Sequence, residues 1–366
     1  MNSVRLLHAA DLHLDSAFEA LPGTLAAQRR REQRQLLRAL PALAKAQGAQ
    51  LILLPGDLLD TDSPYGETVR MLADAFAETD AHVFISPGNH DYYTANAPYA
   101  RMRFPDNVHI FTHARLEPVE IKELGVRVWG AAFESRSCPA LLRGFALERG
   151  DGFLNLLCVH GEVGDPNSPY NPMTEAELAA SGFDYAALGH VHTYSGLHRA
   201  GDTFYAWPGC AEGRGFDETG EKGVLIATVS RGHAETEFVP LGGRRYEKLA
   251  VDVTGRNALA AIRTELPPGA AQHIFRITLT GECDRAPNLT QLRAALEGHV
   301  FAMQLRDETR LKRDVWAMAG EDTLRGLFLA ALKQEYDAAE NSETRELVTM
   351  AARWGLAALA RDEEVF

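Results

Sequence analysis

The 366-residue sequence has few cysteines and no long apolar run. Its four cysteines are scattered and form no CxxC pair, which indicates reduced thiols and hence a cytoplasmic protein. No stretch reaches the roughly 18 uninterrupted apolar residues that a membrane span needs. The apolar stretch near the N-terminus is too short for a signal peptide, and charge interrupts it at once. We therefore expect a cytoplasmic protein with no membrane partner.

The chain also lacks an excess of positive charge. Lys and Arg total 37 against 50 Asp and Glu, so the formal net charge is −13. An acidic chain binds nucleic acid only where its basic residues gather on one face. The global charge therefore argues mildly against a DNA partner. With 46% hydrophobic and 24% charged residues, the composition is that of an ordinary globular protein.

Length and pattern predict a chain built from three parts. A chain of 366 residues is too long for one modest core, and no internal repeat or low-complexity segment is visible. Residues 1–243 alternate short apolar runs with helix-like stretches, which is typical of a layered α/β domain. Residues 244–315 have the pattern of a compact βαβαβ unit, and residues 316–366 become helical.

The individual elements follow from apolar runs and helical periodicity. The strands expected in the first part are 4–9, 51–54, 82–86, 107–111, 126–132, 154–159, 184–188, 223–229 and 235–241. The helices expected there are 25–47 and 67–79. The second part is expected as strand 246–253, helix 257–265, strand 273–280, helix 288–298 and strand 300–307.

The helical tail carries apolar residues at helical spacing on two segments. The first face consists of Leu324, Leu327, Phe328, Ala331 and Leu332, and the second of Leu347, Met350, Ala351 and Trp354. Asn341 and Ser342 supply a break and a fresh N-cap between them. Two interpretations stay open: a helical hairpin docked on its own protein, or a site where a partner binds the apolar anchors.

Polar residues of metal-ligand type follow five of the expected strands. They are Asp11 and His13 in ADLH, Asp57 in PGD, Asn89 and His90 in PGNHD, His160 in VHGE, and His190 and His192 in GHVH. Open α/β sheets place their ligand sites beyond the carboxyl ends of the strands, so these loops should converge. Each motif alone occurs by chance in many proteins, whereas five in order do not. Carboxylates, imidazoles and one amide together predict a metal site.

The set D-x-H, G-D, G-N-H-D, H-G and G-H-x-H resembles the calcineurin-like metallophosphoesterase superfamily over about residues 4–229. Three stretches, AADLHLDSAF, FDYAALGHVH and WPGCAEGRGFDETGEKG, resemble its DNA-repair exonuclease branch of the SbcD and YhaO type. The resemblance implies an α/β fold: a four-layer α/β/β/α sandwich of two β-sheets flanked by helices, with a small α/β capping domain and a helical C-terminal tail.

The resemblance further implies two divalent metal ions. Asp11, His13, Asp57 and His192 would hold the first, and Asp57, Asn89, His160 and His190 the second, so that Asp57 bridges. Two such ions about 3.5–4 Å apart clamp the attacking and leaving oxygens of an in-line displacement. The likeness favours Mn²⁺, while mixed nitrogen and oxygen ligands are equally compatible with Fe²⁺ or Zn²⁺.

By the same resemblance, His90 is the catalytic histidine rather than a ligand. It would stabilise the transition state or protonate the leaving oxygen, and an unperturbed imidazole with a pKa near 6.5 can do either at neutral pH. Asp91 would then orient that ring and support its charge, as a carboxylate does for other catalytic histidines.

The sequence indicates the substrate less clearly than it indicates the metal ligands. Arg30, Arg34 and Arg38 fall at i, i+4 and i+8 on one expected helix, and Arg214 lies in the GRGFDE stretch. We predict that these arginines contact substrate phosphates, the alternative being a solvated arginine face balanced by Glu32.

Together these features predict a two-metal phosphodiesterase that hydrolyses DNA, an exonuclease of DNA repair. In the exonucleases that it resembles, a C-terminal helical segment engages a coiled-coil ATPase, so the resemblance implies an SMC-like ATPase as partner of the tail. It also leaves a homodimer open. The alternatives are a phosphodiesterase or phosphatase for a small nucleotide and, less well supported by the complete ligand set, a non-catalytic interaction scaffold.

Overall fold

The structure is a computed structural model that describes residues 3–61, 63–77, 79–148, 150, 152–312 and 314–360. Glu78 of the expected helix 67–79 and residues 361–366 of the expected tail lie outside the described residues. The chain divides into a large unit, Met1–Leu249 with Leu266–Ile277 and Leu296–Gln304, and a small unit that holds the rest. The expected boundaries at residues 243 and 315 stay a prediction.

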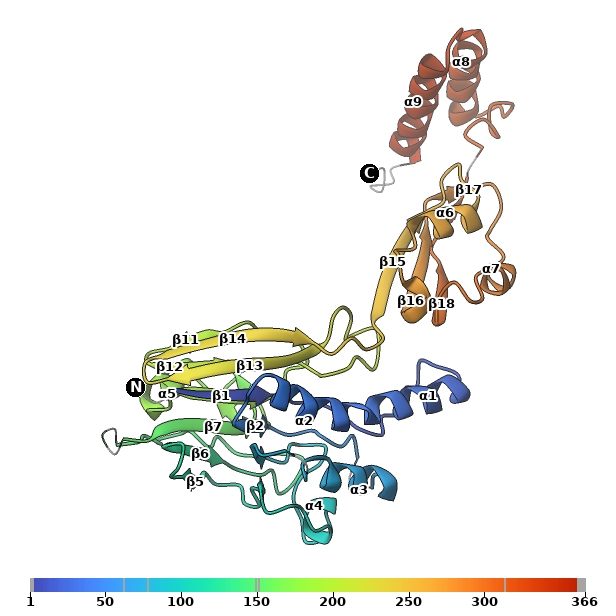
Figure 1. Ribbon diagram of the computed structural model, residues 1–366. Helices are drawn as coiled ribbons and strands as arrows, with labels where there is room; N and C mark the ends of the chain where they lie inside the picture. Colours follow the sequence, from blue (N-terminus) through green and yellow to red (C-terminus); the bar gives the residue numbers. More distant parts are fainter. Residues whose placement is uncertain are drawn as a thin grey trace. The chain divides into compact units, whose positions relative to one another are not determined.

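The large unit contains a first six-stranded sheet in the order β14–β13–β1–β2–β3–β4. Its strands are β1 Ser3–His8, β2 Leu51–Leu54, β3 His82–Ile85, β4 Val108–Ile110, β13 Gly223–Ser230 and β14 His233–Pro240. Strands β1 to β4 are parallel, whereas β13 is antiparallel to both of its neighbours. In Figure 1 the blue β1 lies beside the yellow β13, so the sheet joins distant parts of the sequence. The carboxyl ends of β1, β2 and β3 consequently share one edge.

A second six-stranded sheet has the order β11–β12–β10–β7–β6–β5. Its strands are β5 Glu117–Ile121, β6 Val126–Gly130, β7 Leu154–His160, β10 Tyr185–Gly189, β11 His198–Ala200 and β12 Thr203–Ala206. The four inner strands are parallel, and the two edge strands are antiparallel to their neighbours. Two short strands, β8 Glu162–Val163 and β9 Pro172–Met173, pair with each other beyond β7.

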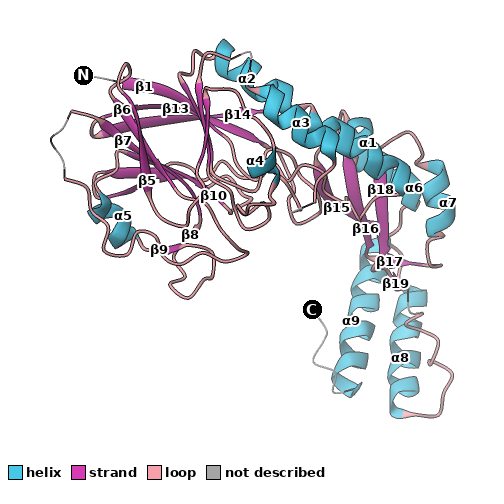
Figure 2. Ribbon diagram, turned by 90° about the horizontal axis from the view of Figure 1, so that it is seen from below, coloured by secondary structure: helices cyan, strands magenta, loops and turns pink. Residues whose placement is uncertain are grey.

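Strands β1, β2, β3, β7 and β10 are largely buried because the sheets pack on each other and on helices (Figure 2). Val4 and Leu6 of β1 belong to the core between the sheets, which also contains Tyr185 of the second sheet. Leu7, on the opposite face of β1, packs in the core that contains Leu37. The alternation of faces along a strand explains why the whole run VRLL is apolar apart from Arg5.

The helices that flank the sheets are α1 Gly23–Arg34, α2 Leu36–Ala46, α3 Gly66–Ala75, α4 Pro98–Arg101 and α5 Glu175–Ser181. Helices α2 and α3 cover the outer face of the first sheet, and α5 contributes Leu178 to the core on the outer face of the second. The fold predicted from the sequence, two large sheets flanked by helices, is therefore confirmed. The single helix expected over 25–47 is instead two helices that meet at Gln35, whose backbone keeps helical angles.

Several short elements were missed by the sequence prediction, among them α5 and the short strands β5, β11 and β12. Helix α5 did carry a signal. Thr174 accepts a hydrogen bond from the Glu177 amide, and the Glu177 carboxylate accepts one from the Thr174 amide, which is a capping box. These three strands have three to five residues and too little alternation to be recognised from pattern alone.

The expected βαβαβ order is present as β15 Tyr246–Asp252, α6 Ala258–Glu265, β16 Ile274–Thr280, α7 Leu289–Ala295 and β18 Ala302–Asp307. The three strands form a sheet in the order β15–β16–β18, and a 3₁₀ turn spans Ala270–Gln272. A pair of two-residue strands, β17 Glu282–Cys283 and β19 Arg310–Leu311, follows in the small unit.

The tail forms a hairpin of α8 Leu324–Ala338 and α9 Ser342–Ala360 in the small unit. Its own small core contains Val315, Leu329 and Ala352, with Phe328, Leu332 and Leu356 packed against them. Five apolar side chains of the hairpin stay between 47% and 71% exposed: Leu324, Leu327, Leu347, Met350 and Trp354. Among the described helices, none is long and apolar enough to cross a membrane.

Candidate metal centre

The loops that follow β1 and β2 are tied to each other by backbone hydrogen bonds. The Asp11 amide donates to the Gly56 carbonyl at 3.1 Å, and the His13 amide donates to the Asp57 carbonyl at 2.9 Å. In the second sheet, β7 ends at His160 and β10 ends one residue before His190. Parallel strands thus deliver the predicted donors to one edge, as the strand-end argument requires.

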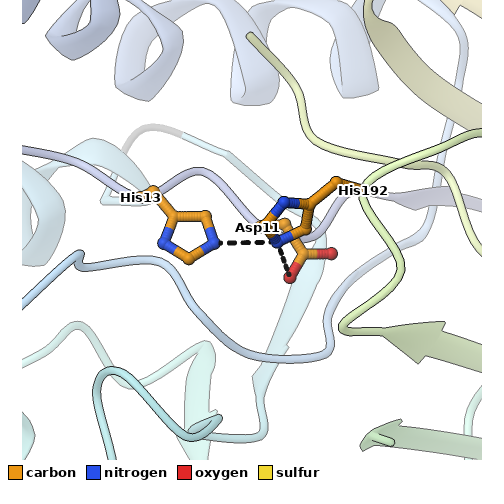
Figure 3. A group of neighbouring side chains, drawn as sticks. All are labelled: Asp11, His13 and His192. Carbon is orange, nitrogen blue, oxygen red and sulfur yellow. Dashed lines mark hydrogen bonds and ion pairs between the residues drawn. The ribbon is translucent and has the colours of Figure 1, made fainter. Parts of the chain in front are cut away.

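Asp11, His13 and His192 form a first donor group, in which the candidate ligand atoms lie within 4.8 Å of one another. The Nε2 atoms of His13 and His192 are 3.2 Å apart, and His192 Nε2 lies 3.8 Å from Asp11 Oδ1 (Figure 3). Asp57 Oδ2 is 3.7 Å from His13 Nε2. The four residues predicted for the first ion are therefore neighbours.

A second donor group contains Asp57 and His160 together with Asp11. His160 Nε2 lies 2.9 Å from Asn89 Oδ1, 3.5 Å from Asp57 Oδ2 and 3.3 Å from His190 Nδ1. All four residues predicted for the second ion meet here, and Asp57 adjoins both sets, as a bridging carboxylate must.

Four of the predicted ligands have a left-handed backbone that side chains rarely adopt. The φ angles are 52° at Asp11, 43° at His13, 52° at Asp57 and 96° at His190. Each such residue costs about 1–3 kcal/mol and persists where the surroundings dictate it, typically at functional sites. Gly88 shows how tight the packing is, because a Cβ there would lie 2.3 Å from Asp57 Oδ1. The strained backbone and the tight packing together direct the side chains of the predicted ligands toward one another.

Burial disfavours charge on these groups. It raises the pKa of Asp11 to about 8, with the charge of Asp57 adding to the effect, and it raises the pKa of Asp57 to about 6. Burial likewise lowers the pKa of His160 and of His190 to about 4 each. Neutral imidazoles offer lone pairs, and buried carboxylates without a bound cation are unstable as anions. A divalent cation would satisfy both, so the donor set fits a metal centre.

His90 is the most accessible residue of the cluster, with a side chain that is 43% exposed. Its amide donates to Asp57 Oδ1 at 2.9 Å, and its ring Nδ1 lies 3.1 Å from the Asp60 carbonyl oxygen. Its ring nitrogen also comes within 4.8 Å of the ligand atoms of His13 and Asp57. The geometry therefore places His90 next to the donor atoms and is compatible with a catalytic histidine and with a metal ligand.

The structure places Asp91 differently from the prediction. Its buried carboxylate accepts hydrogen bonds from the amides of Asp57, Leu58, Leu59 and Gly88 and from the Tyr99 hydroxyl. Among the described residues, these donors saturate its oxygens, and its contacts do not include the His90 ring. The predicted support of His90 by Asp91 is corrected accordingly: Asp91 fastens the Asp57 loop, and Asp60 lies beside the ring.

The arginines predicted to contact DNA are not a uniform free face. Arg34 forms ion pairs of 2.9 Å with Asp15 and 2.8 Å with Glu67, and its side chain is only 13% exposed. Arg30 donates to the Ala17 carbonyl, and Arg38 is exposed on α2. A carboxylate 19 residues away neutralises the middle arginine of the three, and a role of these arginines in binding substrate stays a prediction.

Arg214 is also held by protein carboxylates rather than open to a phosphate. It lies 2.9 Å from Asp60 and 2.6 Å from Glu218, and its side chain is 20% exposed. Sequence reasoning missed both carboxylates. Asp60 ends the GDLLD stretch and Glu218 ends GRGFDE, so each stood within a motif already singled out. It also missed Gln33, whose amide donates to the carbonyls of Leu12 and His13 from α1.

Residues 4–194, just over half of the chain, match the family described as calcineurin-like phosphoesterase. A protein of Bacillus subtilis (strain 168) named "Uncharacterized metallophosphoesterase YhaO" is 30% identical over 273 residues. The match covers 72% of this chain and 66% of that protein, so this chain spans just under two thirds of the relative's length. The chain belongs to the calcineurin-like phosphoesterases, a family of metal-dependent phosphoester hydrolases. The predicted superfamily is confirmed, while Mn²⁺ and the exonuclease branch stay predictions.

Proposed function

We propose that this protein is a two-metal phosphodiesterase that hydrolyses DNA as an exonuclease. The observation that carries the proposal is the position of Asp57, whose carboxylate adjoins His13 of one donor set and His160 of the other. A shared carboxylate is how a protein brings two cations close enough to act on one phosphate.

The chain's own residues divide the work between binding and proton transfer. The first ion would be held by Asp11, His13, Asp57 and His192, and the second by Asp57, Asn89, His160 and His190. When bound, such ions neutralise charge on the phosphoryl oxygens and make water more acidic. The buried carboxylates and imidazoles set the position of the phosphate at the open side of the cluster, where His90 stands.

His90 is suited to act on the leaving oxygen. A carbonyl oxygen can only accept, so the ring Nδ1 beside the Asp60 carbonyl carries a proton and donates it. Nε2 is then the atom left for the substrate. In the imidazolium form Nε2–H donates to the leaving oxygen, and after transfer the neutral ring keeps its Nδ1 proton on the Asp60 carbonyl.

DNA as substrate is supported by the three sequence stretches that resemble the exonuclease branch and by the exposure of His90, which suits an extended substrate. The net charge of −13 and the ion-paired Arg34 instead favour a small nucleotide, which is the second candidate. Both candidates use the same metal-dependent step and differ only in what surrounds the scissile phosphate.

A substrate panel with added Mn²⁺ separates these candidates. We expect turnover of a synthetic diester, such as bis(p-nitrophenyl) phosphate, and of duplex or single-stranded DNA. Preferred turnover of cyclic nucleotides or dinucleotides over DNA would replace the DNA proposal with the second candidate. No hydrolysis of any phosphoester by the wild-type protein, with Asp57→Ala as blank, would leave only a scaffold.

We further propose, as the sequence prediction had it, that an SMC-like ATPase binds the α8–α9 hairpin in the cytoplasm. The exposed side chains of Leu347 and Trp354 support this, since helix-in-groove binding uses such apolar anchors. Deleting residues 320–366 should leave diester hydrolysis unchanged and abolish co-elution with the ATPase. Retained co-elution would place the partner site elsewhere.

A further inference from the structure

A cluster of charged side chains lies behind the first donor group, and we call Asp60, Arg214 and Glu218 the Arg214 network. Asp60 Oδ1 lies 2.9 Å from His13 Nδ1, and Glu218 Oε1 lies 2.7 Å from His192 Nδ1. Arg214 joins the two carboxylates, with Nη1 2.9 Å from Asp60 and Nη2 2.6 Å from Glu218. One guanidinium therefore ties together the carboxylates that hold both imidazoles.

These contacts decide which nitrogen of each imidazole faces the donor group. A carboxylate can only accept, so each Nδ1 carries a proton and donates it. Arg214 Nη2 also lies 3.2 Å from His192 Nδ1, but the Glu218 carboxylate is closer to Nδ1, at 2.7 Å, and needs the Nδ1 proton for that contact. Each Nε2 consequently keeps a lone pair, and the two Nε2 atoms stand 3.2 Å apart. Two lone pairs at that separation repel each other unless a cation or a proton lies between them.

The network is rigid as well as correctly charged. Glu218 is 5% exposed, and its second oxygen accepts the Arg214 backbone amide at 2.7 Å. Arg214 Nε adds a contact of 3.2 Å to the first oxygen of Glu218. Because both oxygens of Glu218 are engaged, the carboxylate has one orientation, and it passes that orientation on to the His192 ring.

The histidines of the second donor group are held by other groups. His160 Nδ1 donates to the Pro55 carbonyl at 3.0 Å, and His190 Nε2 lies 3.9 Å from Glu162. A change in the Arg214 network should consequently affect the first donor group and spare the second.

We propose that Asp60, Arg214 and Glu218 are positioning residues that fix the tautomer and direction of His13 and His192 and thereby set metal affinity at the first donor group. Outer carboxylates of this kind raise the basicity of a ligating histidine and hold its ring in place. The proposal rests on the metal centre of the proposed function and is independent of its substrate. It also replaces the predicted role of Arg214 as a phosphate contact.

The test compares Mn²⁺ binding by the wild-type chain with that of Glu218→Gln and Asp60→Asn. Glu212→Gln is the matched control, because Glu212 is also 5% exposed and forms an ion pair of 2.8 Å, with the buried Arg29. Isothermal titration calorimetry gives the affinities, and the metal content after gel filtration gives the stoichiometry. The melting temperature in chelator shows that each variant is folded without metal. If Glu218→Gln does not fold, Asp60→Asn, at a site that is 25% exposed, carries the test.

We expect two Mn²⁺ ions per wild-type chain and a loss of about 10–100-fold in affinity for one of them in each network variant. Glu212→Gln should bind both ions normally. The double variant should lose less than the product of the single losses, since both carboxylates act through Arg214. Unchanged affinities in the network variants, or an equal loss in Glu212→Gln, would overturn the proposal.

Hydrolysis of bis(p-nitrophenyl) phosphate then separates positioning from catalysis. Raising the Mn²⁺ concentration should restore the rate of Glu218→Gln but not that of His90→Gln, and failure to restore it would contradict a positioning role. A wild-type chain that binds two ions and hydrolyses no phosphoester would refute the proposed function while the affinity comparison still decides the network. Turnover by the wild type together with unaltered Mn²⁺ binding in the variants would support the proposed function and refute the positioning role of the network.

Discussion

The metal loops and the α8–α9 hairpin both depart from the usual rule that apolar side chains are buried and polar ones exposed, but in opposite directions. In the loops, charged and polar side chains are buried: Asp11, His13 and Asp57 are at most 1% exposed. In the hairpin, large apolar side chains are exposed, with Leu324 at 71% and Trp354 at 57%. A buried polar group is stable only with a partner, and an exposed apolar patch is retained where something binds it. The first departure fits the metal centre, and the second supports the proposed partner site.

The two regions differ in how far contacts within the chain hold their unusual side chains in place. Around the loops, the contacts of Asp91, Gln33 and Asp60 hold the ligand side chains in place, so that a cation completes the cluster. In the hairpin, Leu329 and Ala352 form a core while Leu347 and Met350 are 65% and 47% exposed. The first site fits a small ion, whereas the partner proposed for the second is a macromolecule.

The largest effect is expected from the carboxylate shared by both donor sets. Asp57→Ala removes a buried charge adjoining His13 and His160, so at least one ion should be lost and diester hydrolysis should fall to background. Metal analysis and a diester assay measure the two losses. Full metal occupancy with normal turnover in this variant would remove the basis for a two-metal centre.

The next effect concerns the accessible member of the cluster. His90→Gln should retain near-normal metal content and lower kcat by about 10²–10⁴-fold, the usual scale for a lost acid–base group. Metal content and kcat are measured on the same preparation. A fall in metal content as large as the fall in kcat would make His90 a ligand, a role for which its distance to Asp57 leaves room.

The hairpin allows buried and exposed apolar residues to be compared directly. Leu329→Ala, at a fully buried position, should lower the free energy of unfolding of the small unit by about 2–5 kcal/mol. Trp354→Ala, at an exposed position, should change it by no more than about 0.5 kcal/mol. Chemical denaturation measures the change in free energy of unfolding for both variants, with limited proteolysis of the hairpin as the second readout. A large cost for Trp354→Ala would mean that this side chain is covered within the chain itself.

A pH-dependent effect on stability comes from a buried polar residue outside the site. His8 Nε2 donates to the Leu188 carbonyl at 3.1 Å, and Nδ1 accepts from the Tyr185 hydroxyl at 3.0 Å, so the folded ring is neutral. Burial lowers the pKa of His8 from 6.5 to about 3. As the pH falls below 6.5, the unfolded chain therefore takes up the proton first and the folded state loses stability.

The His8 contribution amounts to about 1.4 kcal/mol per pH unit between pH 6.5 and the folded pKa. His8→Gln should remove this slope while the contributions of the buried His160 and His190 remain. Urea denaturation of both proteins at pH 7, 6 and 5 measures the difference. Parallel pH dependences of the wild type and the variant would show that His8 is charged in the folded state.

Local signals were sufficient for most of the architecture and for the donors. The nine strands expected over residues 4–241 all exist, because most of them are apolar runs followed by turn residues, which is typical of buried strands. Asp11, Asp57 and His160 were identified because a strand end is visible in the sequence and parallel strands end together. Short strands such as β11 and β12 went unseen, since their pairing and not their composition makes them strands.

What the sequence by itself determined is the set of candidate ligands, their order and the layered fold around them. Only the tertiary structure decided what supports them: that Asp91 holds backbone amides, that Asp60 and Glu218 hold His13 and His192, and that Asp15 neutralises Arg34. The physical reason is that strand ends and apolar runs are local in sequence, whereas a hydrogen bond or ion pair joins whichever donor and acceptor the fold brings within about 3 Å. His192 and Glu218 are 26 residues apart, and Arg214 and Asp60 are 154 apart, so no local pattern could couple them.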